Sequence, residues 1–192
     1  MLYRVRDWLA LRASGYQAFR APTLNELYRQ FRVGSVVTLA NENLSPEELT
    51  GAEAGFDLAP LPGLKTRVTG FWNKVEDPVT NVTLTTAVPG CEPSATLTCR
   101  QRQNLGETRI RGVEVEAEYL AFQNLLGKDD LTLTGSYLFD DTTVLKAPAQ
   151  PSLVGLRIAQ VPKHMATVGL RYRNPVLADL ALQARYVGRQ FE

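Results

Sequence analysis

Two cysteines are the first side chains in the sequence whose spacing suggests chemistry. Cys91 and Cys99 enclose the polar, turn-prone stretch EPSATLT. Their spacing fits neither a redox C-x-x-C motif nor a zinc knuckle, and the single histidine is far away in the sequence. A disulfide closing this loop would contribute about 2.5 kcal/mol through loop-closure entropy. We therefore predict a Cys91–Cys99 disulfide and an oxidising compartment; two free thiols in a reducing compartment are the alternative.

The remaining titratable residues do not form a catalytic set. His164 follows the segment VPK at a predicted strand start, and we interpret it as a solvated or interfacial histidine rather than a general base. The sequence contains no G-x-S-x-G motif and no glycine-rich phosphate loop. The aspartate pairs at 129–130 and 140–141 lack the oxygen-ligand repeat of a calcium site and are interpreted as polar strand ends. We expect no enzyme activity, no metal site and no cofactor.

Charge and hydropathy exclude two further classes of protein. The chain has 21 basic and 20 acidic residues and therefore lacks the excess of positive charge typical of nucleic-acid-binding proteins. No apolar stretch approaches the roughly 18 residues that a transmembrane helix needs. Asp7, Arg12 and Ser14 interrupt the N-terminal region, so it does not resemble a signal peptide. These features alone favour the cytosol, whereas the predicted disulfide does not.

Alternation of apolar and polar residues is the dominant pattern, and helical periodicity is scarce. The alternation predicts an all-β chain, an antiparallel meander of about seven strands, each with one apolar and one polar or small face. The alternating segments are residues 9–14, 52–58, 64–73, 113–119, 131–139, 166–172 and 180–186.

The connections between these segments alternate between long and short. In an antiparallel meander this places all long connections at one end of the sheet and all short ones at the other. Short periplasmic turns and long extracellular loops are typical of an outer-membrane β-barrel, whereas a β-sandwich has no reason to sort its loops by length. The long connections are 20–44, 85–103 and 146–160, and the short ones are 60–63, 123–128 and 174–178.

One predicted strand carries three glutamates on the same face. Glu114, Glu116 and Glu118 cannot face lipid, where unpaired charge costs several kcal/mol. In a wide barrel they would line a hydrated lumen opposite Lys65 and Arg67 of the neighbouring strand. A solvated sheet face is the alternative interpretation.

Strand length and strand count also bear on the fold. Segments 65–84 and 104–121 are longer than typical sandwich strands but suit tilted membrane strands. About seven strands fall short of the smallest single-chain barrel, and an open sheet would leave unpaired edges in lipid. We expect either one further strand or a larger barrel to which this chain contributes.

Several motifs occur in a consistent order along the chain. Residues 19–28 (FRAPTLNELY) resemble the F-R-A-P-x-x-x-E-L-Y stretch of TonB-dependent outer-membrane receptors. Residues 41–47 (NENLSPE) resemble the N-P-N-L-x-P-E segment that follows in that family, although Glu42 stands where proline is common. Further resemblances are the E-x-G at 53–55, the N-x-G at 104–106, the G-V-E at 112–114 and the P-x-H at 162–164.

This resemblance implies that residues 1–192 form part of the C-terminal half of a 22-stranded transmembrane β-barrel. We expect the plug domain, the TonB box and the terminal strands to lie outside this sequence. The family takes up scarce nutrients such as ferric siderophores or cobalamin across the Gram-negative outer membrane, and the TonB complex acts through the plug. The alternatives are a small free-standing outer-membrane barrel with a structural or adhesive role and a secreted β-sandwich binding module.

The resemblance also suggests where a ligand would bind. A small molecule or metal chelate would contact the long-loop end, where arginines can grip anionic groups bidentately and a tyrosine offers a stacking face. Basic loop residues without any function are the alternative interpretation. The candidate ligand-binding residues are Tyr28, Arg29, Arg32, Arg100 and Arg102.

Overall fold

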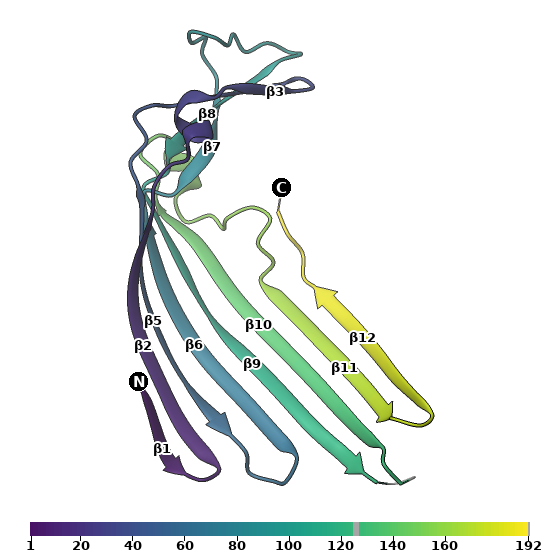
Figure 1. The fold of residues 1–192 in the computed structure, drawn as a ribbon. Coiled ribbons are helices and arrows are strands. Elements are labelled where there is room, and N and C mark those ends of the chain that lie inside the picture. The colour runs from purple at the N-terminus through teal and green to yellow at the C-terminus, as the bar shows by residue number, and fades with distance from the viewer. Residues whose placement is uncertain (125–126, 192) are drawn as a thin grey trace.

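The computed structural model describes residues 1–124 and 127–191. Within these residues the chain forms an eight-stranded antiparallel sheet and a smaller four-stranded sheet (Figure 1). We call the large sheet the wall. We call residues 21–46 and 77–106, which contain the small sheet and a short helix, the cap. No helix in the described part of the chain has the length and apolar character needed to cross a membrane.

The wall is the predicted meander. Each of its strands pairs antiparallel with the next wall strand along the chain. The prediction of about seven strands missed β1, whose five exposed residues are too few for alternation to stand out. The wall strands are β1 (Leu2–Arg6), β2 (Leu9–Arg20), β5 (Glu47–Leu58), β6 (Leu64–Glu76), β9 (Glu107–Gln123), β10 (Asp130–Lys146), β11 (His164–Asn174) and β12 (Ala178–Val187).

The connections are sorted by length as the sequence predicted. Short turns join the wall strands at the lower end in Figure 1, and long links join them at the upper end. The expected turn at 123–128 includes residues 125–126, which lie outside the described residues. Two long links form the cap, and the third contains the 3-10 helix η1 (Pro151–Leu153).

The register of the wall brings the predicted charges together. Lys65 lies opposite Glu118, and Arg67 lies opposite Glu116, which confirms the pairing expected from the sequence. The Lys65 Nζ atom is 4.0 Å from Glu118 Oε1, and the Arg67 Nε atom is 3.0 Å from Asp57 Oδ1. Exposed pairs of this kind add little stability. Their value here is that they identify the hydrated face of the wall.

The opposite face of the wall is apolar and has no protein partner in the described chain. Val68 pairs with Val115 on this face, and Leu133 lies between Tyr119 and Leu170. Large apolar side chains here stay exposed, including Val168 at 60% and Leu182 at 72%. A soluble monomer rarely exposes an apolar patch of this extent. The alternation of apolar-out and polar-in residues is that of a membrane barrel strand.

The single long strand expected over 65–84 is wrong. The wall strand β6 ends at Glu76, and Val79 begins β7 of the cap. Asp77 has a positive φ of 53°, and Pro78 has no N–H to donate, so a regular ladder cannot continue through them. The segment expected over 104–121 is divided similarly, because Gly106 has a φ of 113° between β8 and β9.

The long links, predicted as loops, contain ordered elements. The first link holds α1 (Leu24–Tyr28), β3 (Phe31–Val33) and β4 (Val36–Leu39). The second holds β7 (Val79–Leu84) and β8 (Thr98–Asn104). These elements have three to seven residues, and strands this short carry almost no periodic signal.

Candidate functional site

The cap is one body built from two distant links. Its sheet has the order β3-β4-β8-β7. The central pair, β4 and β8, runs parallel, with Val36 beside Thr98 and Leu39 beside Gln101. Parallel strands cannot be joined by a tight turn, and here the wall strands β5 and β6 separate them in the sequence. The pairing therefore holds both links together above the end of the wall.

A disulfide forms the centre of the cap. Cys91 and Cys99 are bonded, with their Cα atoms 5.9 Å apart. Cys99 is fully buried and packs in a cluster with Cys91, Val37 and Leu39. A sheet of such short strands buries little apolar area, and small domains of this kind commonly depend on disulfides. Three partly buried side chains complete the cluster: Leu84, Val88 and Leu97.

Helix α1 is held at both ends by side chains. Thr23 is its N-cap, and Glu26 completes a capping box by accepting a 2.7 Å hydrogen bond from the Thr23 backbone N–H. At the other end, the Arg102 guanidinium donates to the carbonyl oxygens of Asn25 at 2.7 Å and Arg29 at 3.2 Å. Arg102 lies on β8, so it fastens the helix to the cap sheet.

The five residues predicted to bind ligand all lie in the cap, but on different faces. Tyr28 and Arg29 are exposed at the C-terminal end of α1, close to Arg102. Arg100 pairs with Thr38 and shares the Arg102 side of the sheet. Arg32 is opposite Val37, which pairs with Cys99, so it lies on the side of the disulfide. The structure therefore brings together four of the five residues and separates Arg32.

The side chains of Arg102 and Arg32 make contacts within the described part of the chain. Besides holding α1, the Arg102 guanidinium lies 5.3 Å from the centre of the Phe31 ring. The Arg32 Nε donates a 2.8 Å hydrogen bond to the Gly34 carbonyl. Tyr28 is 68% exposed, and Arg29 and Arg100 are exposed as well. A ligand could reach these three side chains without displacing an internal hydrogen bond of Arg102.

A hollow beside Arg32 separates β3 and β4 from the disulfide loop. Its volume is about 540 Å³. Val37 and Leu97 provide apolar lining, while Arg32 and Glu92 contribute opposite charges. An apolar surface with a few polar groups is typical of small-molecule sites. Arg32 is one of the residues predicted to bind ligand, but the hollow itself gives no sequence signal, because its walls come from both links.

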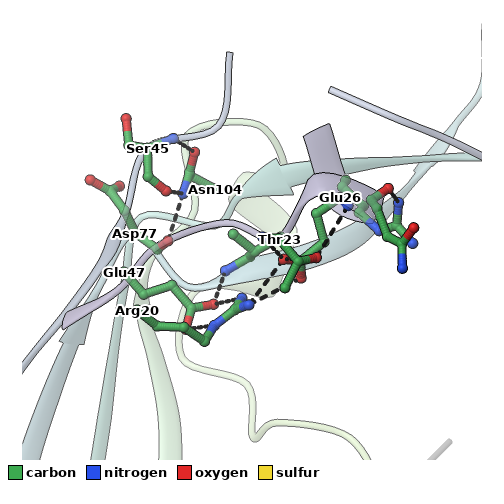
Figure 2. Close-up of polar contacts among 10 residues, drawn as sticks. Arg20, Thr23, Glu26, Ser45, Glu47, Asp77 and Asn104 are labelled. Atoms are coloured by element: carbon green, nitrogen blue, oxygen red, sulfur yellow. Dashed lines mark hydrogen bonds and ion pairs between the residues drawn. The ribbon is translucent and has the colours of Figure 1, made fainter. Parts of the chain in front are cut away.

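A cluster of charged residues lies where the cap meets the wall (Figure 2). The Arg20 guanidinium, at the end of β2, bonds to Glu26 Oε2 at 3.0 Å and to Glu47 Oε1 at 2.6 Å. Burial alone would raise the pKa of Glu26. Hydrogen bonds from the Thr23 backbone, Arg20 and the Thr23 hydroxyl outweigh burial and hold that pKa at about 2. These residues belong to two separate sequence motifs, and their convergence gives no signal in the sequence.

Comparison with known proteins identifies a family and a set of similar folds. The family model described as TonB dependent receptor-like, beta-barrel matches residues 1–192. The heme/hemopexin utilization protein C of Haemophilus influenzae (strain 86-028NP) is 31% identical over 135 residues. That alignment covers 62% of this chain and 19% of the relative, so the chain spans about a fifth of the relative's length.

Solved structures share the fold at low sequence identity. The ferric enterobactin receptor PfeA, in complex with BCV-L6, has a TM-score of 0.69 and 16% identity over 98% of this chain and 27% of that one. The copper transporter OprC has a TM-score of 0.64 and 20% identity over 90% and 23%. The FrpB iron transporter of Neisseria meningitidis (F3-3 variant) has a TM-score of 0.59 and 19% identity over 97% and 25%.

Proposed function

The chain belongs to the TonB-dependent receptor β-barrel family, and from that premise we propose that it is a barrel segment of a receptor for active uptake of a scarce nutrient. The family match over residues 1–192 carries this proposal. The family consists of receptors and implies an outer-membrane location. The chain spans roughly a quarter of the similar solved structures, so transport itself is a property we propose for the complete receptor.

We propose that the wall crosses the outer membrane with the cap on the outside. The apolar face is bordered near the cap by Trp72, Tyr137 and Tyr186, and near the short turns by Tyr119 and Tyr172. Aromatic girdles of this kind flank the apolar band of membrane barrels.

The same face becomes ionic at the Trp72 end of this aromatic border, on the cap side of Tyr137. Arg111, opposite Trp72, is 3.0 Å from Asp141. Paired charges are costly within lipid but not in water or among headgroups. We place the outer border of the membrane between the Tyr137 and Asp141 levels of β10.

The described wall is open at two edges, β1 and β12. An unpaired strand edge in lipid leaves backbone groups without hydrogen-bond partners, which a bilayer does not tolerate. We propose that further strands close these edges into a 22-stranded barrel around a plug, and that the TonB complex acts through this plug. A free-standing small barrel would need the two edges to meet.

We propose that the cargo is an anionic small molecule or metal chelate, bound on the cap. The exposed residues Tyr28, Arg29 and Arg100 would supply a stacking face and bidentate donors. Arg32 would contribute at the hollow, and Arg102 would hold the helix that carries Tyr28. The similar proteins are named for heme, ferric enterobactin, iron and copper. Ferric siderophores and heme are therefore the first ligands to test.

The test is ligand binding and uptake by the complete receptor. We expect R29A/R32A/R100A to weaken binding of a ferric siderophore or heme by ten- to one-hundredfold, on the order of 1–3 kcal/mol. Arg171→Ala, at the short-turn end of the wall, is the matched control and should bind normally. Uptake should stop in cells without TonB. Uptake that continues without TonB, or no binding of any iron or heme complex, would overturn the proposal.

A further inference from the structure

We infer that Arg20 is a positioning residue that holds the cap on the wall in the orientation competent for binding, without touching the ligand. This inference rests on the proposed function of the cap. It gives the F-R-A-P motif residue a role that its place outside the candidate ligand surface does not otherwise explain.

The cap joins the wall through four chain crossings, at residues 21–23, 40–46, 77–78 and 105–106. At one crossing, Leu105 packs with Val144 and Ala147 in a small buried cluster. The disulfide cluster lies wholly within the cap. The crossings after β2 and before β5 contain one buried apolar side chain, Leu44, and a set of polar contacts, and these polar contacts connect the crossings to the wall.

Arg20 and Glu47 connect the wall to both links of the cap. They are direct partners in the β2–β5 pair, and the guanidinium grips the carboxylate bidentately at 2.6 and 2.7 Å. The third guanidinium nitrogen, Arg20 Nη1, donates to both carboxylate oxygens of Glu26 in α1. Glu47 Oε1 also accepts a 2.7 Å hydrogen bond from the backbone N–H of Val79, the first residue of β7. One ion cluster therefore joins β2, β5, α1 and β7 (Figure 2).

The charge balance makes Arg20 the critical member of this cluster. A single guanidinium neutralises one of two carboxylates, Glu26 and Glu47, and its planar fork bonds to both. Without Arg20 the two carboxylates would face each other without a cation and repel. Lysine would restore the charge but not the geometry, because an ammonium lacks the fork.

Asn104 provides a second, uncharged fastening at the neighbouring crossings. Its side-chain amide donates to the carbonyls of Asp77 at 2.6 Å and Ser45 at 3.1 Å, and its side-chain oxygen accepts from the Ser45 N–H at 3.0 Å. This contact fixes the crossings to one another, while Arg20 fixes them to the wall. Loss of Arg20 should therefore change the angle of the cap rather than unfold it.

The experiment compares variants of the complete receptor: R20Q, R20K, E47Q and R20Q/E47Q. The readouts are the Kd for the ferric siderophore or heme that the wild type binds, the maximal uptake rate at saturating ligand, and the heat-modifiable gel mobility of the folded barrel. The control is R171Q, which breaks a bidentate pair with Asp179 at 2.6 and 3.1 Å, far from the cap. Spin labels at Ser94 in the cap and Thr134 on the wall report the orientation directly.

We expect R20Q to raise Kd about tenfold and broaden the label distances, with the gel mobility and maximal uptake rate unchanged. R20K should fall between R20Q and wild type. R20Q/E47Q should be no worse than R20Q, because removing Glu47 relieves the repulsion. R171Q should match wild type.

Two results would overturn the inference: a wild-type Kd with wild-type label distances in R20Q, or loss of the folded barrel in R20Q. A wild-type receptor that binds no ligand would overturn the proposed function instead. In that case the label distances alone still decide whether Arg20 orients the cap.

Discussion

The wall and the cap are built from the same kind of element but stabilised in opposite ways. Wall strands such as β9 and β10 have 17 residues and pair along long backbone ladders, while their apolar side chains stay exposed. Cap strands have three to seven residues and enclose a buried cluster around the disulfide. A membrane supplies the apolar partner that the wall lacks. The cap, which we place in water, must bury its own apolar side chains.

The two regions also differ in how their strands find each other. Each wall strand pairs with the next wall strand in the sequence, whereas the cap depends on the parallel pairing of β4 and β8 across three intervening strands, β5, β6 and β7. Closing such a long loop costs conformational entropy. The packing of Val37 and Leu39 of β4 against the two cysteines, together with the polar contacts of Arg20 and Asn104, offsets part of that cost.

The largest expected effect is the loss of stability caused by a charge on the apolar face of the wall, compared with the same charge on the hydrated face. Leu133→Arg places a charge on the apolar face and should destabilise the folded receptor by about 2–4 kcal/mol in lipid bilayers. Ser136→Arg is on the hydrated face of the same strand, opposite Glu116, and should change stability little. Urea unfolding in lipid vesicles, followed by gel mobility, measures both. Equal destabilisation by the two variants would contradict the assignment of the faces.

The next effect should be confined to the cap. Replacing both cysteines, C91A/C99A, removes the cross-link and should destabilise the cap by about 2.5 kcal/mol. Limited proteolysis should then cleave within residues 85–103, while the wall keeps its folded gel mobility. Reduction of the wild type with dithiothreitol should have the same result. Unchanged protease resistance in C91A/C99A would show that the cap does not depend on its disulfide.

The smallest expected effect is the pH dependence of the Arg20–Glu26–Glu47 cluster, where the cap meets the wall. The pKa of Glu26 is lowered from 4.5 to about 2, so its stabilisation is present above the ordinary pKa and is lost as the pH falls toward 2. Because the cluster is partly exposed, we expect no more than about 1 kcal/mol. The Ser94–Thr134 label distances should broaden between pH 4.5 and 2 in wild type. In E26Q the distribution of label distances should already be broad at pH 6 and should change less with acid. A narrow distribution that does not change with pH in wild type would contradict this prediction.

The sequence predicted which residues belong to the candidate site, but it did not predict their contacts with one another. The cysteine spacing and the arginines of the long links pointed to the cap, because residue type and chain position suffice for those inferences. The contacts of Arg102 with the Asn25 and Arg29 carbonyls gave no sequence signal. Nor did the convergence of Arg20, Glu26 and Glu47, which lie on separate elements.

By itself, the sequence determined the wall: its alternating faces, its sorted connections and the opposition of Lys65 and Arg67 to the glutamates. These features follow from a period of two, which is a local property that any ten-residue window displays. Only the tertiary structure decided that strand β6 ends at Glu76, that the long links merge into one cap, and that the Arg20 guanidinium bridges Glu47 of the wall and Glu26 of the cap. Those outcomes depend on pairings between distant segments, whose energies come from contacts that do not exist until the chain has folded.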